Sequence, residues 1–270
     1  STCSLRVRGL KRRLEILIPI LLGTVLYVLL YSTGLLSISR SATTLAMKYL
    51  EIVPNPFNQY TSLSYEVVTS VIWDHRGFDT FFETTVLFAA VVAAVGLLGG
   101  LQDKVVEKRE MTLIPRVAAR VLAPLTAVIS IAIAIHGHIS PGGGFQGGVV
   151  FVVAPLMIML ALSGGMIQGM GLKSNRLMMA RGLALVMIAA TGLTPLIYGF
   201  TKSFNAYLFQ NLAKPGSPFA YAGVLDLGFT RILLSGSLIV YNILEYIAVS
   251  AGFTLSLYLL TRFFEEGGEK

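Results

Sequence analysis

The sequence predicts an all-α, polytopic membrane protein with about six transmembrane helices and both termini in the cytoplasm. Apolar residues make up 54% of the chain and charged residues only 13%, with a mean hydropathy of +0.74. Soluble domains carry about 25% charged residues. The apolar residues also come in blocks of the roughly 20 residues that a membrane-spanning helix needs. These observations argue against a soluble enzyme.

Six blocks are long enough to cross a bilayer, and each must be helical because hydrocarbon offers no water to open backbone groups. The expected spans are Leu14–Ile38, Asp79–Leu101, Val117–Ile135, Gly147–Ile167, Gly182–Phe200 and Ser237–Leu260.

Lys and Arg residues predict the orientation. With a cytoplasmic N-terminus, 15 of the 21 Lys and Arg, Arg181 among them, fall in inside segments and six in outside segments. This bias follows the positive-inside rule. The net charge of +7 could suggest a nucleic-acid partner, but no basic stripe interleaved with aromatic residues is present. A single cysteine, Cys3, excludes an intramolecular disulfide and a cysteine-based metal cluster.

The chain is expected to comprise a two-helix module at residues 1–103, a charged linker at 104–116 and a four-helix module at 112–270. The outside loop of the first module holds a stretch, Thr43 to Val53, that could form a short interfacial helix. Pro54-Asn55-Pro56 should end that helix.

Two carboxylates mark the outer start of the second span. Asp79 and Glu83 are four residues apart and share one helix face near the N-terminus, where the macrodipole favours negative charge. Asp79, which follows Gly77, could serve only as a helix cap. Glu83 lies more than one turn into the span, where a carboxylate must face protein or water, and it is a candidate for the ion or proton path.

A glycine-rich segment, His136 to Gly148, joins the third and fourth spans. The segment allows sharp turns and close helix approach; its distinctive residues are His136, His138, Pro141, Gly142, Gly143, Gly144, Phe145, Gly147 and Gly148. A phosphate-binding P-loop would need a Gly-Lys-Ser/Thr sequence, which is missing. The His-x-His pair supplies only two zinc ligands with no acid or cysteine nearby. A proton-relay role for His136 is favoured.

Glu245 lies eight residues into the last span, with Asn242 one turn before it. Two interpretations remain open: a place on an ion or proton path, or a polar contact that holds a neighbouring subunit.

The segment from His136 to Gly148 closely resembles the signature of the B-type subunit of Mrp-type multisubunit sodium/proton antiporters. Val71 to Leu87 separately resembles a segment near the carboxyl end of the A-type subunit of these antiporters. Seven residues match that second motif: Asp74, Arg76, Gly77, Phe78, Asp79, Thr80 and Glu83. His75 replaces a Phe, and Phe81-Phe82 replace Leu-Gly.

The resemblance implies a non-redox subunit of a multisubunit Na⁺/H⁺ antiporter module, without a catalytic centre, metal or cofactor of its own. Related modules occur in membrane-bound hydrogenases and sulfur-reducing complexes related to respiratory complex I, where the A-type tail is often a separate small protein. That arrangement favours such an energy-converting complex; the alternatives are a stand-alone Mrp antiporter or a structural scaffold that seals the membrane arm. The implied partners are other membrane subunits, the lipid bilayer, Na⁺ and H⁺, with no nucleic acid. If the chain is such a subunit, the path candidates are the ionisable residues singled out above: Asp79, Glu83, His136 and Glu245.

Overall fold

The computed structural model describes residues 2–34, 41–98, 111–162 and 169–267, which are mostly helical with one two-stranded hairpin. The chain separates into two compact units, residues 1–47 and 48–270. The first unit contains α1 (Thr2–Ser32), whose described apolar stretch is Leu17–Ser32. The short α2 (Thr44–Ile52) ends just before Pro54, as the sequence predicts for that helix.

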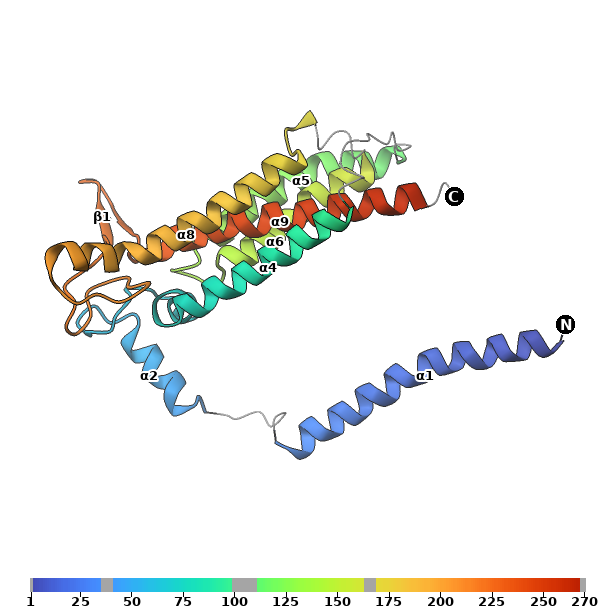
Figure 1. Cartoon of the computed structure of the whole chain (residues 1–270), viewed down its shortest axis with the longest axis horizontal. Coiled ribbons are helices and arrows are strands. Elements are labelled where there is room, and N and C mark those ends of the chain that lie inside the picture. Colours follow the sequence, from blue (N-terminus) through green and yellow to red (C-terminus); the bar gives the residue numbers. More distant parts are fainter. Residues whose placement is uncertain (1, 35–40, 99–110, 163–168, 268–270) are drawn as a thin grey trace. The chain divides into compact units, whose positions relative to one another are not determined.

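The second unit contains the helical bundle drawn in Figure 1. Its elements are α3 (Val67–Ser70), the π-helix η1 (Val71–His75), α4 (Gly77–Leu98), α5 (Leu113–Ile135), α6 (Gly144–Ala161), α8 (Ser174–Lys202), β1 (Val224–Asp226), β2 (Arg231–Leu233) and α9 (Leu238–Gly267).

Five helices of the second unit, α4, α5, α6, α8 and α9, are long and apolar enough to cross a membrane. They correspond to five of the six expected spans. The remaining expected span, Leu14–Ile38, overlaps α1, and its end at residues 35–38 lies outside the described residues. Most of the expected charged linker, residues 104–110, also lies outside them.

Several expected helix boundaries were wrong. Helix α5 begins at Leu113 rather than Val117, and helix α9 ends at Gly267 rather than Leu260. Helix α6 begins at Gly144 rather than Gly147, so the end of the glycine-rich segment is helical. Helix α8 begins at Ser174 rather than Gly182, and Arg181, expected in an inside loop, lies within the helix and is only 1% exposed. Arg181 was expected in the loop before the fifth span because a charged side chain is costly in lipid. In the structure, packing against α9 shields this arginine.

Helix α9 holds the bundle together because it packs against α4, α5, α6 and α8. Close approach to α6 depends on small residues: a Cβ on Gly148 would lie 2.7 Å from Cβ of Val249 on α9. Interfaces built on small residues are typical of helices that associate within membranes.

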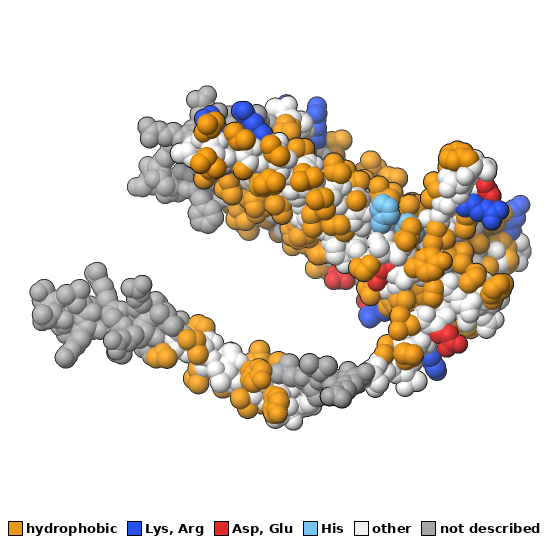
Figure 2. Space-filling view, turned by 180° about the vertical axis from the view of Figure 1, so that it is seen from behind, with side chains coloured by type: hydrophobic (Ala, Val, Ile, Leu, Met, Phe, Trp, Pro, Cys, Tyr) orange, Lys and Arg blue, Asp and Glu red, His pale blue; other side chains and the backbone are white. Residues whose placement is uncertain are grey.

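The outward face of the bundle is apolar. Figure 2 shows hydrophobic side chains along the bundle and the charged side chains gathered toward its ends. Exposed residues include Val86 on α4, Val128 on α5 and Val186 on α8. Such a surface suits contact with lipid or with other membrane subunits.

The loops before η1 and after α8 form a polar cap on one end of the bundle. Asp74 of η1, with a fully buried side chain, forms an ion pair with Lys214 at 2.7 Å. The Asp74 carboxylate also accepts hydrogen bonds from the Ser62 hydroxyl at 2.5 Å and the Asn211 backbone N–H at 3.2 Å. Asp74 thus joins two loops that are about 140 residues apart in the sequence.

Candidate functional site

The candidate site is centred on Glu245, on the side of α9 that faces the start of α6. This residue is only 4% exposed. A Cβ on Gly144, the first residue of α6, would lie 2.8 Å from the Glu245 Oε2 atom. Any larger residue at position 144 would therefore displace the carboxylate. The glycine-rich segment brings the positive end of the α6 dipole against a buried acid.

Buried polar atoms without hydrogen-bond partners occur at this carboxylate and on the turn of α9 that precedes it. Four buried residues carry side-chain atoms that have no hydrogen-bond partner: Trp73 (Nε1), Tyr241 (hydroxyl), Asn242 (Nδ2 and Oδ1) and Glu245 (Oε2). The Trp73 indole and the Phe145 backbone N–H interact with the Glu245 carboxylate, although the Trp73 contact does not meet hydrogen-bond geometry. Buried polar groups are normally paired, so this concentration of unpaired ones marks a place that water, a proton or a partner group must complete.

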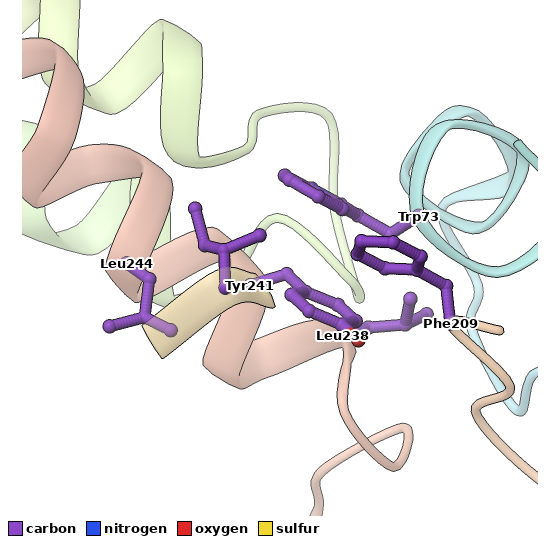
Figure 3. Close-up of a cluster of buried hydrophobic side chains, with 6 residues drawn as sticks. Trp73, Phe209, Leu238, Tyr241 and Leu244 are labelled. Atoms are coloured by element: carbon purple, nitrogen blue, oxygen red, sulfur yellow. The ribbon is translucent and has the colours of Figure 1, made fainter. Parts of the chain in front are cut away.

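Aromatic packing fixes the outer side of the site. The Trp73 ring stacks on Tyr241 with centroids 4.7 Å apart, and Phe209 packs against both rings. Figure 3 shows this cluster together with Leu238 and Leu244 of α9. Because the rings are held rigidly, the Trp73 Nε1 atom is fixed beside Glu245.

Glu83 lies beside this site, and its carboxylate interacts electrostatically with that of Glu245. Unlike Glu245, Glu83 is exposed on the surface of α4. The other expected acid, Asp79, lies in the first turn of α4, where Arg76 pairs with it on the surface. Sequence reasoning placed Glu83 and Glu245 separately; the structure brings these two together.

The two histidines of the glycine-rich segment lie in different environments. His136 ends α5, is exposed, and its Nδ1 lies 2.9 Å from the Ala132 carbonyl oxygen. His138 is 1% exposed, and its Nε2 lies 2.8 Å from the Leu233 carbonyl oxygen. Burial lowers the pKa of His138 from its usual value of 6.5. In the described part of the chain, no three residues of the His, Cys, Asp or Glu types come together as a metal site would require.

The glycines and Pro141 shape the turn between α5 and α6. Gly143 adopts a φ of +138°, which L-residues with side chains rarely adopt, and its N–H donates to the Ile133 carbonyl oxygen. A Cβ on Gly147 would lie 2.7 Å from the Ser130 carbonyl oxygen, so α6 packs closely on α5. The segment therefore serves mainly to place the start of α6 against α9.

Sequence reasoning missed Arg181 as a candidate functional residue. Its Nε and Nη1 atoms are buried without a hydrogen-bond partner, its guanidinium lies over the Phe88 ring at 5.6 Å, and it packs directly on Gly252 of α9. A buried, incompletely paired charge inside a helical bundle is a functional candidate. The sequence offered one indication of this role, because Arg181 is followed directly by Gly182 and a long apolar run. The same pattern also occurs where a cytoplasmic loop ends and a span begins, so it does not distinguish the two cases.

The fold and site define a polytopic helical membrane protein that holds ionisable side chains inside its bundle, as ion-translocating membrane proteins do. A family model described as a domain related to the MnhB subunit of Na⁺/H⁺ antiporter matches residues 114–255. The chain belongs to this family.

Two curated relatives match parts of this chain in sequence. A probable K⁺/H⁺ antiporter A/B protein of Rhizobium meliloti is 25% identical over 214 residues, covering 68% of this chain and 21% of that protein. An uncharacterised protein of Methanocaldococcus jannaschii is 31% identical over 112 residues, covering 35% of this chain and 43% of that protein. The chain thus spans less than half the length of these relatives.

Two solved structures share the fold. A chain of the membrane-bound sulfane sulfur reductase, an archaeal respiratory membrane complex, superposes with a TM-score of 0.64 at 25% identity, covering 93% of this chain and 98% of that one. A chain of the Mrp complex from Dietzia sp. superposes with a TM-score of 0.61 at 18% identity, covering 91% of this chain and 26% of that one. The resemblance expected from the two sequence motifs is confirmed.

Proposed function

We propose that this chain is a non-redox membrane subunit that contributes to Na⁺/H⁺ translocation within an energy-converting complex of the sulfane-reductase or hydrogenase type. The observation that carries the proposal is the buried, incompletely paired Glu245 carboxylate at the start of α6, next to Glu83. Membership of the MnhB-related family supports a place in an antiporter module. The sulfane sulfur reductase chain supports the energy-converting complex because the two chains cover each other almost fully.

The groups around Glu245 favour proton transfer over binding of the metal cation. Trp73 Nε1 can only donate a hydrogen bond, and the Phe145 backbone N–H in the first turn of α6 is a donor as well. Hard cations such as Ca²⁺ and Mg²⁺ require several oxygen ligands, and Na⁺ is a hard cation as well. Hydrogen-bond donors cannot supply such ligands. Donors suit a carboxylate that alternates between charged and protonated forms. In this proposal Glu245 carries a proton, while the cation is bound elsewhere in the complex.

Glu83 is the second carboxylate of the proposed path. Its exposure on a membrane-spanning helix means that in the bilayer it must face a partner protein or water. A proton leaving Glu245 would pass to Glu83 and then to a group on the neighbouring protein. Asp79 would help water reach the entrance, and Arg181 would supply a fixed positive charge deeper in the bundle.

We also propose that both termini face the cytoplasm, as the distribution of Lys and Arg favours. The polar cap that contains Asp74 would then lie on the outer side of the membrane. We further propose the division into residues 1–103, 104–116 and 112–270, because a charged linker separates the second span from the third.

Neutral replacement of Glu83 tests the function. The variant Glu83→Gln in the assembled complex should abolish cation/proton exchange in membrane vesicles while the subunits still co-purify. Glu51→Gln, on α2 and outside the spans, is the control and should leave exchange unchanged. If Glu83→Gln instead disassembles the complex with no selective transport defect, the chain is a scaffold that seals the membrane arm. Co-purification without redox subunits would favour a stand-alone Mrp antiporter.

A further inference from the structure

A groove with no part in the proposed proton path opens between α5 and α6. Its volume is about 480 Å³, which lies within the 300–1,000 Å³ typical of ligand pockets. Its walls are almost wholly apolar, and they include Ala123, Ala127, Phe151 and Ile158. The groove ends near Met170, in the turn that precedes α8, so it lies at the end of the bundle where α5 begins.

Two prolines explain why neighbouring helices leave this space. Pro124 of α5 and Pro155 of α6 both line the groove. A proline inside a helix removes a backbone hydrogen bond and bends the helix, so two prolines at one depth part the helices locally. The alanines on α5 have no side chain long enough to fill the gap.

The single charged residue among those that line the groove is Arg120, one of two arginines on the first turns of α5. Arg116 lies four residues earlier and therefore on the same helix face. Basic residues at the end of an apolar groove between membrane helices fit an anionic lipid headgroup. We infer that this groove binds one anionic phospholipid of the bilayer, with an acyl chain between α5 and α6 and the headgroup phosphate at Arg120.

A helix of a neighbouring protein fits the same groove less well. A helix with side chains is about 10 Å across, so the groove volume would hold only about one helical turn. An acyl chain is thinner and can follow the groove along α5 from Arg120 to Ala127, which is about 10 Å. The shape and the placement of charge therefore favour lipid.

Photolabelling of the purified complex in lipid nanodiscs tests this site. The probe is phosphatidylglycerol with a diazirine in one acyl chain, and labelled peptides are identified by mass spectrometry. Phe151 and Ile158 should be labelled. Ala127→Leu, which fills the groove, should reduce that labelling at least about tenfold. Ala190→Leu, which adds the same bulk to an exposed position on α8, should leave it unchanged.

A second variant tests the headgroup contact independently of packing. A basic residue near the membrane surface contributes about 1 kcal/mol to binding of anionic lipid, which corresponds to about a fivefold change. Arg120→Gln should therefore reduce labelling by the phosphatidylglycerol probe about fivefold and leave labelling by the matching phosphatidylcholine probe unchanged. Equal labelling in Ala127→Leu and the unaltered complex would overturn the inference. An equal effect of Arg120→Gln on both probes would also overturn it. The inference would fail as well if a photoreactive residue introduced at position 127 formed crosslinks to a helix of a partner protein.

Discussion

Two buried carboxylates in this chain have opposite surroundings. Asp74, in the polar cap, receives an ion pair from Lys214 and hydrogen bonds from Ser62 and Asn211. Glu245, inside the bundle, has an oxygen without a partner and lies among further unpaired groups. Both side chains are almost fully buried.

The difference separates structure from function. A buried charge that is fully paired stabilises one arrangement and is costly to disturb. A buried charge that is incompletely paired is costly to keep and persists where the protein uses it. Asp74 fastens two loops together, and we propose that Glu245 serves the proton path.

Of the variants that test the contrast between Asp74 and Glu245, Glu245→Gln should have the largest effect on transport. Glutamine has nearly the same shape but cannot bind and release a proton, so exchange in vesicles should fall about 100-fold or more. Removing an unpaired buried charge should leave the melting temperature of the complex unchanged or raise it. A variant that melts earlier yet transports normally would reverse the roles assigned to the two acids.

Asp74→Asn should have the opposite phenotype. It leaves Lys214 buried without its counter-charge, which typically costs about 3–5 kcal/mol. The yield of assembled complex and its melting temperature should fall, while exchange per assembled complex is retained. Asp226→Asn is the matched control, because the Asp226 pair with Arg231 is exposed and should contribute at most about 1 kcal/mol. Restoration of stability by adding Lys214→Met to Asp74→Asn would identify the unpaired lysine as the cause.

Gly144→Ala should have an intermediate effect. The added Cβ meets the Asn242 carbonyl oxygen and the Glu245 side chain, so α6 must move away from α9. Overpacking of this kind costs about 1–3 kcal/mol. Exchange should fall together with stability because the helix terminus and the carboxylate separate. Gly182→Ala is the control on α8, where an added Cβ meets nothing within 4 Å, and equal losses in both variants would contradict this account.

The smallest effect concerns acid stability through His138. Burial lowers its pKa in the folded chain below the usual 6.5, so protonation favours the unfolded chain. The stability that depends on neutral His138 is complete above about pH 6.5 and falls as the pH drops toward the folded-state pKa. Thermal unfolding between about pH 7.5 and 5.5 should show this loss, and His138→Gln should flatten the profile. A profile of the same steepness in His138→Gln would assign the pH dependence to other groups.

Sequence alone predicted the fold well where the physical signal is local. The apolar blocks located α4, α5 and α9 to within a few residues, except at the start of α5 and the end of α9, because a helix is the only open-chain structure that satisfies its backbone in lipid. The α2 helix and its end before Pro54 followed from local signals as well.

The candidate site was predictable only in part because its chemistry depends on packing between distant segments. Glu245 and Glu83 stood out as acids inside apolar runs, but nothing local indicated that their carboxylates interact. Nothing in the sequence distinguishes Trp73 and Tyr241 from other aromatic residues, but the structure stacks the two rings and places the Trp73 indole at Glu245. Arg181 was assigned to a loop because basic residues usually lie outside membrane spans. Arg181 is an exception, because Gly252 on α9 has no side chain and leaves room for the guanidinium inside the bundle.

The central position of α9 also has a consequence for biogenesis. This helix follows α4, α5, α6 and α8 in the chain and packs against all of them, so it leaves the ribosome after they do. Until it arrives, Arg181 lacks the glycine surface that shields it, and the first turn of α6 has no acid to face. The contacts that shield Arg181 and that set the start of α6 against Glu245 can therefore form only after α9 has been made.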